Sequence, residues 1–224
     1  ASDVYKRQVY NRAVEQELTI DRNPFRTVFT GVEKTRKRAI SISDIKRIRD
    51  LDLSLKPNLE FARNLFLFLF LCRGMSFLDA AFLKKSDIQS GILTYRRHKT
   101  NQVLHIKIIK PIKELVDRYS SNDSPYLLPI ITRPHCDERR QYETALRRVN
   151  KSLKTIAGMV KLPIPLTTYV SRHAWATIAK SKNIPVNVIS DALGHDSIAT
   201  TQIYLASIDT STIDRANELI IKDL

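Results

Sequence analysis

The sequence predicts a mainly α-helical protein that contains a small β-hairpin or sheet. Apolar residues recur at helical spacing over most of the chain, as in the stripe of Leu146, Val149 and Leu153. Around residue 91 the period changes, because residues 91–97 and 103–109 are short and rich in strand-forming side chains. The 224 residues are 43% hydrophobic, which is enough for one substantial core and excludes a disordered chain.

The first 37 residues are expected to form a unit apart from the main domain. Residues 4–18 have helical periodicity, which ends at the stretch from Asp21 to Pro24. Residues 22–38 are basic and poor in periodicity, as expected of an extended basic strap. So short a helix cannot bury a core by itself, so residues 1–37 are assigned to the end of a helical domain with its linker, and residues 38–224 to the main domain.

Caps and turns divide the main domain into its elements. Ser41 and Ser43 are candidate N-caps for a helix through Asp50, and Pro57 starts a helix that runs to about Cys72. A capping box of Ser76 and Asp79 opens a short helix. The strands at 91–97 and 103–109 form a hairpin, and residues 122–134 are rich in turns. Further helices are expected over residues 111–119, 141–159, 168–181, 186–193, 198–206 and 210–221.

The charge of the chain predicts a polyanionic partner. The formal net charge is +14, and cations that neutralise phosphates release counterions and gain salt-sensitive affinity. Charge alone leaves open a protein that is merely basic. The two cysteines, Cys72 and Cys136, lack the spacing of a zinc site or a disulfide framework, and the apolar run from Leu65 to Cys72 is far shorter than the roughly 20 residues of a membrane span. We expect a cytoplasmic protein with no membrane partner.

Three motifs follow one another in the last third of the chain. Arg172-His173 comes first, Leu193-Gly194-His195 second, and Tyr204 lies nine residues after His195. This order and spacing resembles the tyrosine recombinases, the phage-integrase family. The resemblance covers residues from about 38 to the end, and it implies the helical catalytic-domain architecture of that family. It also implies that residues 1–37 are the end of a core-binding domain.

Attack on a DNA phosphate by a protein hydroxyl needs a nucleophile, donors for the developing charge and an acid for the departing 5′ oxygen. Tyr204 is the candidate nucleophile, which would form a 3′-phosphotyrosyl link. Arg172 and His195 can donate to the scissile phosphate. The family places a mobile lysine in a hairpin as the general acid, and Lys99 matches that position. Such a site requires neither metal nor cofactor.

Two positions depart from the family pattern. Tyr169 stands three residues before Arg172, where the family has a histidine. A tyrosine can donate to a phosphate, but its ordinary pKa near 10 makes it a poor general base at neutral pH. The family's first arginine aligns with Ser76, and Arg73 lies three residues upstream, about one helical turn away. We expect Arg73 to supply this guanidinium, and Ser76 to act as a cap whose hydroxyl also contributes.

The same departures resemble integrases carried by conjugative transposons and related mobile elements. The matching strings are 73–77, 168–173 and 201–205. The resemblance implies double-stranded DNA as the substrate, a homo-oligomer that is a tetramer in synapsis, DNA-bending accessory proteins and association with the nucleoid. The C-terminal residues 209–224 are the candidate contact with a neighbouring subunit.

Two alternatives remain, and a third does not fit. A type IB topoisomerase-like activity would use the same covalent step and reseal the original strand. A degenerate integrase would bind DNA without cleaving it, as the altered positions 76 and 169 suggest. A structural helical protein that is merely basic does not explain the ordered set of Lys99, Arg172, His195 and Tyr204.

Overall fold

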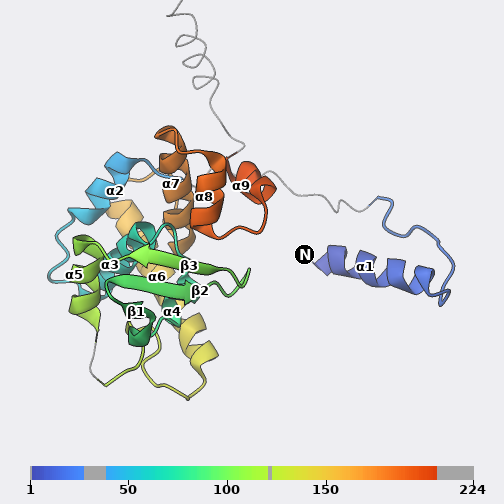
Figure 1. Cartoon of the computed structure of the whole chain (residues 1–224). Helices are drawn as coiled ribbons and strands as arrows, with labels where there is room; N and C mark the ends of the chain where they lie inside the picture. The colour runs from blue at the N-terminus through green and yellow to red at the C-terminus, as the bar shows by residue number, and fades with distance from the viewer. Residues whose placement is uncertain (1, 28–38, 121–122, 206–224) are drawn as a thin grey trace, which may run out of the picture. The chain divides into compact units, whose positions relative to one another are not determined.

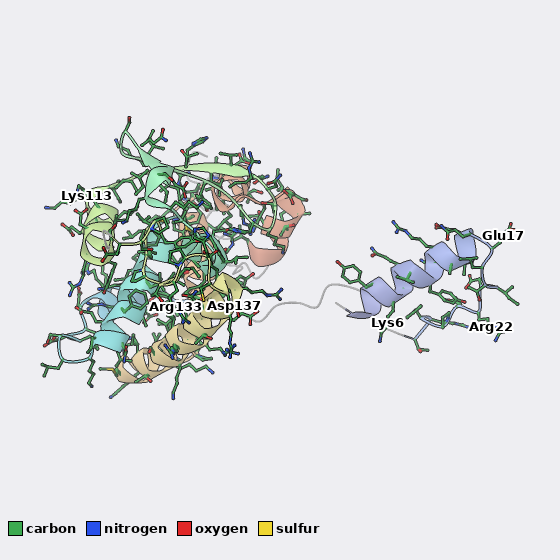
Figure 2. The ribbon with its side chains drawn as sticks, turned by 90° about the horizontal axis from the view of Figure 1, so that it is seen from below. Lys6, Glu17, Arg22, Lys113, Arg133 and Asp137 are labelled. Atoms are coloured by element: carbon green, nitrogen blue, oxygen red, sulfur yellow. The ribbon has the colours of Figure 1, made fainter. Side chains whose placement is uncertain are left out.

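The computed structural model describes residues 2–27, 39–120 and 123–205. The chain divides into two compact units, residues 1–36 and residues 37–224. In the N-terminal unit, α1 (Ser2–Glu15) occupies most of the segment expected to be helical. The Tyr10 hydroxyl donates to the carbonyl of Ile20 (3.1 Å) and accepts from the Arg22 amide (2.7 Å), so the chain folds back along the helix. Figure 2 labels Lys6 on this helix and Arg22 on the returning segment. Most of the expected basic strap, residues 28–38, lies outside the described residues.

The second unit is built around the apolar helix α3 (Pro57–Leu71) (Figure 1). This helix contacts α2 (Ile42–Arg49), α5 (Lys110–Tyr119), α6 (Glu138–Met159) and α7 (Thr168–Ser181). The apolar run from Leu65 to Cys72 is largely buried, although Leu67, Phe70 and Leu71 are half-buried. The helices of the unit are α2 (Ile42–Arg49), α3 (Pro57–Leu71), α4 (Phe77–Ala81), α5 (Lys110–Tyr119), α6 (Glu138–Met159), α7 (Thr168–Ser181), α8 (Val186–Leu193) and α9 (Ile198–Leu205), with a 3₁₀ turn η1 (Lys85–Asp87).

The hairpin is confirmed as part of a three-stranded antiparallel sheet. Its order is β1 (Ile88–Gln89), β2 (Ile92–Arg96) and β3 (Val103–Lys107). Leu93 pairs with Ile106, and all the side chains at 93, 95 and 97 are buried while those at 92, 94 and 96 are exposed. The sequence did not reveal β1, because a two-residue strand carries no readable period. Figure 1 shows the turn of the β2–β3 hairpin beside the segment that joins α8 to α9.

The caps account for the helix starts. Ser41 caps α2 through a capping box with Asp44, and the Ser76 hydroxyl accepts from the Asp79 amide at the start of α4, so both expected caps are confirmed. Ser43 lies inside α2 and is not its cap. The helix expected from residue 141 begins three residues earlier, because the side chain of Asp137 accepts from the Arg140 amide and caps α6.

Two apolar clusters stabilise the unit. The larger one joins α2–α6, the sheet and the start of α7. The smaller one joins α7, α8 and α9 through Ala176, Ile189, Leu193 and Leu205. The end of α9 is therefore held by α7 and α8. Within the described ranges, no helix combines the length and the apolarity that crossing a bilayer requires. The helix expected over residues 210–221 lies outside the described residues.

Candidate active site

Arg172 is buried where three segments of the chain meet. It lies on the second turn of α7, and its side chain is 4% exposed. Its Nη1 donates to the carbonyl of Gly74 (2.8 Å), and its Nη2 donates to the carbonyl of Leu193 (2.6 Å). The same guanidinium thus links the end of α3 to the end of α8. A forked, permanently charged group held in this way is fixed before any anion arrives.

Gly74 makes this close approach possible. Its backbone is left-handed, with φ of +69°. A Cβ at this position would lie 2.8 Å from the Cα of Arg172, a separation that real Cβ atoms do not tolerate against backbone. Because residue 74 has no side chain, the backbone of Arg172 can pack directly against it.

Gly74→Ala is expected to destabilise the fold by about 2–5 kcal/mol, through a left-handed alanine and the displaced start of α7. Gly91→Ala is the matched control, because Gly91 has φ of +75° but nothing within 4 Å of the added Cβ. The control should lose only about 1–2 kcal/mol. Urea unfolding of both variants measures the difference. Equal losses would show that the contact with Arg172 has no energetic weight.

His195 follows the left-handed glycine that ends α8. Gly194 has φ of +63°, a left-handed conformation that favours glycine, and a Cβ there would lie 3.1 Å from the side chains of Arg97 and Leu104. The His195 side chain is buried, and its Nδ1 lies 2.7 Å from the Thr201 hydroxyl on α9. A threonine hydroxyl can donate to Nδ1, and the imidazole proton then sits on Nε2, where it can be donated to a ligand.

Burial, followed by the charges of Arg172, Arg97 and Lys99, lowers the pKa of His195 to about 4. The ring is therefore uncharged at pH 7. Because the unfolded chain binds this proton at an ordinary pKa of 6.5, the unfolded state gains protons first as the pH falls. The contribution of His195 to stability is complete above pH 6.5 and is lost as the pH falls toward 4.

We expect the free energy of unfolding to decrease between pH 6.5 and pH 5, and His195→Gln to reduce this decrease. The carboxyl groups with shifted pKa values have ordinary values of 3.8 and 4.5, so their linkage lies mainly below this window. Urea titrations at several pH values in the window make the test. The same pH dependence in the variant would contradict the assignment.

The hairpin turn is fastened to the turn that precedes α9. The carbonyl of Gly194 accepts from the Thr100 hydroxyl (3.0 Å) and from Nη1 of Arg97. The side-chain amide of Gln102 donates through Nε2 to the carbonyl of His195 (3.3 Å). Lys99 lies between these anchoring residues, and its side chain is exposed. A flexible cation is thus carried on a fixed turn beside His195.

The other side of the turn is held by a buried carboxylate. Asp79 is 3% exposed and accepts from the His98 backbone amide (2.9 Å), and its Oδ1 lies 3.0 Å from Nδ1 of the His98 ring. Its second oxygen accepts from the Ser76 hydroxyl (2.7 Å). The Ser76 hydroxyl therefore donates to Asp79 and accepts from the same residue's amide, which accounts for its role as a cap.

Arg73 precedes the glycine whose carbonyl accepts from Arg172, and Tyr169 lies three residues before Arg172 on α7. Arg73 has a left-handed backbone (φ 59°) immediately before Gly74, and its side chain is half-buried. Tyr169 is 47% exposed, and its ring lies edge-on to His173 on the next turn of α7, with 4.7 Å between the ring centroids. His173 is buried.

Residue 204 belongs to α9, but the side chain of Tyr204 lies outside the described part of the chain. Its position is three residues, about one turn, after Thr201, which is fully buried against His195. The expected nucleophile therefore lies on the same helix, α9, as the threonine that contacts His195.

Arg97 was not expected in the site. It is 7% exposed. Among the described residues, its Nε is the only buried side-chain nitrogen or oxygen atom without a hydrogen-bond partner. The signal was present in the sequence, because Leu93, Tyr95 and Arg97 alternate along one strand and so share its inward face. An arginine that continues an inward-facing apolar series is a candidate functional residue.

A basic groove runs along α6. It has a volume of about 920 Å³ and lies between α6, the start of α3 and the segment before α6. Figure 2 labels Arg133 and Asp137 at the end of the groove where α6 begins. The cations that line it are Arg133, Arg140, Arg148 and Lys151. Within the described residues, no three His, Cys, Asp or Glu side chains are grouped as metal ligands.

Comparisons of sequence and of fold both relate this chain to recombinases and integrases. The chain is 28% identical over 196 residues to tyrosine recombinase XerA of Pyrococcus furiosus, covering 84% of this chain and 65% of the relative. It is 26% identical to tyrosine recombinase XerD of Halalkalibacterium halodurans, covering 87% and 66%. The chain thus spans less than two thirds of the length of these curated relatives.

The fold resembles that of solved integrases. A lambda integrase tetramer bound to a Holliday junction has a TM-score of 0.62 at 17% identity, over 88% of this chain and 56% of that one. The Tn1549 transposon integrase in complex with a circular intermediate DNA has a TM-score of 0.62 at 15% identity, over 93% and 74%. The model of the phage integrase family matches residues 42–210, which is most of the chain and includes every site residue described above. This chain belongs to the phage integrase family.

Proposed function

We propose that this chain is the strand-cleaving part of a site-specific DNA recombinase. The Tyr204 hydroxyl oxygen attacks the scissile phosphorus, the bond from phosphorus to the 5′ oxygen breaks, and a 3′-phosphotyrosyl link forms. The phenolic proton passes to water, and the 5′ oxygen leaves as a hydroxyl with a proton from Lys99. Reversal by the 5′ hydroxyl of a partner strand exchanges the strands.

The remaining residues stabilise the charge on the phosphate. Arg172 and the Nε2 proton of His195 donate to its non-bridging oxygens, and Arg73 is the first candidate for a second guanidinium. Tyr169 is exposed beside the site and can donate through its hydroxyl. The proposed step draws its electrostatic stabilisation from side chains and needs no metal or cofactor.

The observation that carries this proposal is the anchoring of Arg172 and His195 at one turn. Leu193 receives the guanidinium, and His195 lies two residues later, while the turn that carries Lys99 is fastened to the intervening Gly194. This arrangement supports the proposal, since the proposed acid and the two proposed phosphate donors come from three separate segments that meet at residues 193–195. A merely basic structural protein gives no reason for burying Arg172 with both carbonyls.

The proposed substrate is double-stranded DNA, and the proposed assembly is a homo-oligomer, a tetramer when two duplexes are exchanged. The relatives in the comparison include a tetramer on a Holliday junction. The basic groove along α6 supports binding of a phosphate backbone, since its lining contains more cations than anions. DNA-bending accessory proteins, and a location at the nucleoid in the cytoplasm, belong to the same proposal.

The test is incubation of the chain with a nicked duplex whose released fragment diffuses away, so that rejoining is prevented. We expect a covalent protein–DNA adduct on denaturing electrophoresis, and peptide mapping should place the nucleotide on Tyr204. DNA binding without an adduct would favour a degenerate DNA-binding integrase. Relaxation of supercoiled DNA by a monomer without site preference would favour a type IB topoisomerase-like activity.

A further inference from the structure

We propose that Arg97 contacts a non-bridging oxygen of the scissile phosphate and supplies the second guanidinium of the site, a role that rests on the proposed strand cleavage. The position where the family has this arginine is Ser76, whose hydroxyl is engaged with Asp79 on both its donor and its acceptor side. The guanidinium thus comes from the β2–β3 hairpin and not from the start of α4.

The burial of Arg97 calls for an anion. The side chain is 93% buried, given its exposure of 7%. Within the described residues, its Nη1 donates to a neutral carbonyl, that of Gly194, and its Nε has no hydrogen-bond partner. Burying a charged group and one of its donors without compensation is costly. A phosphate oxygen would satisfy the unpaired Nε–H and neutralise part of the charge.

The position of Arg97 is the one that a second phosphate donor requires. Arg172 donates to the carbonyl of Leu193 and Arg97 to that of Gly194, so the two guanidinium groups are held on adjacent peptide units, whose Cα atoms are about 3.8 Å apart. The charges of Arg97, Arg172 and Lys99 all act on His195 at this turn. Two forked cations and one flexible cation therefore surround the imidazole.

The half-buried Arg73 is the competing candidate. It precedes Gly74, whose carbonyl accepts from Arg172, and within the described residues it has no side-chain nitrogen that is both fully buried and unpaired. Arg97, in contrast, has a buried N–H that no acceptor of the described residues pairs. The structure favours Arg97 because this N–H is left for an incoming acceptor.

The first measurement is the rate of adduct formation on the nicked duplex. Arg97→Ala should slow it by about 100-fold or more, as removal of an oxyanion donor does, and Arg97→Lys should keep part of the rate. Lys107→Ala, which removes an exposed cation from the neighbouring strand β3, is the control for charge and should stay within about threefold. Loss of the rate in Arg73→Ala, with Arg97→Ala unaffected, would overturn the proposal.

The second measurement separates phosphate contact from a purely structural role. A duplex with a methylphosphonate at the scissile position lacks the charged oxygen that Arg97 would neutralise, so the deficit of Arg97→Ala should shrink to less than about tenfold. Thr100→Val removes the other donor to the Gly194 carbonyl, and any deficit it causes should be equal on both duplexes. An undiminished Arg97→Ala deficit on the methylphosphonate would show that Arg97 only holds the turn.

The third measurement does not depend on cleavage. If Arg97 binds a phosphate, Arg97→Ala should reduce the slope of log affinity against log salt by about one in DNA-binding titrations. An unchanged slope would contradict the contact. If the unmutated chain forms no adduct, the proposed function fails, and the salt slope still decides whether Arg97 binds a phosphate. Thermal unfolding of each variant checks that it is folded.

Discussion

Tyr204→Phe is expected to abolish the covalent protein–DNA adduct while leaving DNA binding within about threefold of the unmutated chain. The substitution removes the one oxygen that attacks phosphorus in the proposed step, and phenylalanine offers no replacement. Position 204 lies in α9, whose end is held by Leu205 in the cluster with α7 and α8. Loss of a hydroxyl there leaves that apolar anchor in place.

Denaturing electrophoresis with the nicked duplex measures the adduct, and a binding titration measures affinity. Tyr142→Phe is the matched control, because it removes a hydroxyl from a half-buried tyrosine whose ring lies 5.7 Å from that of Phe77 in the core. The control should form the adduct at the ordinary rate. An adduct that persists in Tyr204→Phe would assign the nucleophile to another residue.

Arg172→Ala is expected to reduce the rate of adduct formation by about 1000-fold and to destabilise the fold by about 2–5 kcal/mol. The loss of rate comes from removing a charged donor to the phosphate. The loss of stability comes from leaving the buried carbonyls of Gly74 and Leu193 without their partner, which costs about 1–3 kcal/mol each. Arg172→Lys should retain the charge but cannot bridge both carbonyls.

The two losses can be measured separately. Urea unfolding gives the free energy, and single-turnover cleavage at a temperature where every variant is folded gives the rate. Lys113→Ala on α5 (Figure 2) is the control for loss of a cation, because its exposed pair with Asp117 (2.6 Å) should contribute less than about 1 kcal/mol. A stable but inactive Arg172→Ala would mean that the carbonyls find other partners, and an active one would remove Arg172 from the proposed mechanism.

Local patterns in the sequence predicted the elements with strong boundaries. The bounds of α7 and α8 agree with the expected 168–181 and 186–193, because each has a clear apolar period and a definite turn at its end. The start of α6 was placed too late, since its cap is an aspartate in a left-handed conformation (φ 39°) that only the tertiary structure reveals. Such a cap leaves little trace in a short window of sequence.

The candidate site was predictable where it follows a linear motif. Arg172, His195 and the glycine between the last two helices occur in fixed order, so the sequence identified them, and the structure brings the first two to one turn. Arg97 was missed because its role arises from contacts between the hairpin and residues almost a hundred positions later. The alternation of Leu93, Tyr95 and Arg97 indicates only that Arg97 faces inward, and the contact with Gly194 leaves no pattern in either segment alone.

The fastening of the hairpin to Gly194 also limits how this domain can be recombined with its relatives in protein engineering. The hairpin residues from Arg97 to Gln102 and the turn at Gly194 and His195 fit each other atom by atom, through shared carbonyls and the space that a missing side chain leaves. A chimera that exchanges only the hairpin would combine a foreign hairpin with a turn at Gly194 whose shape fits the original hairpin. The two segments form one module, and they must be inherited or transplanted together.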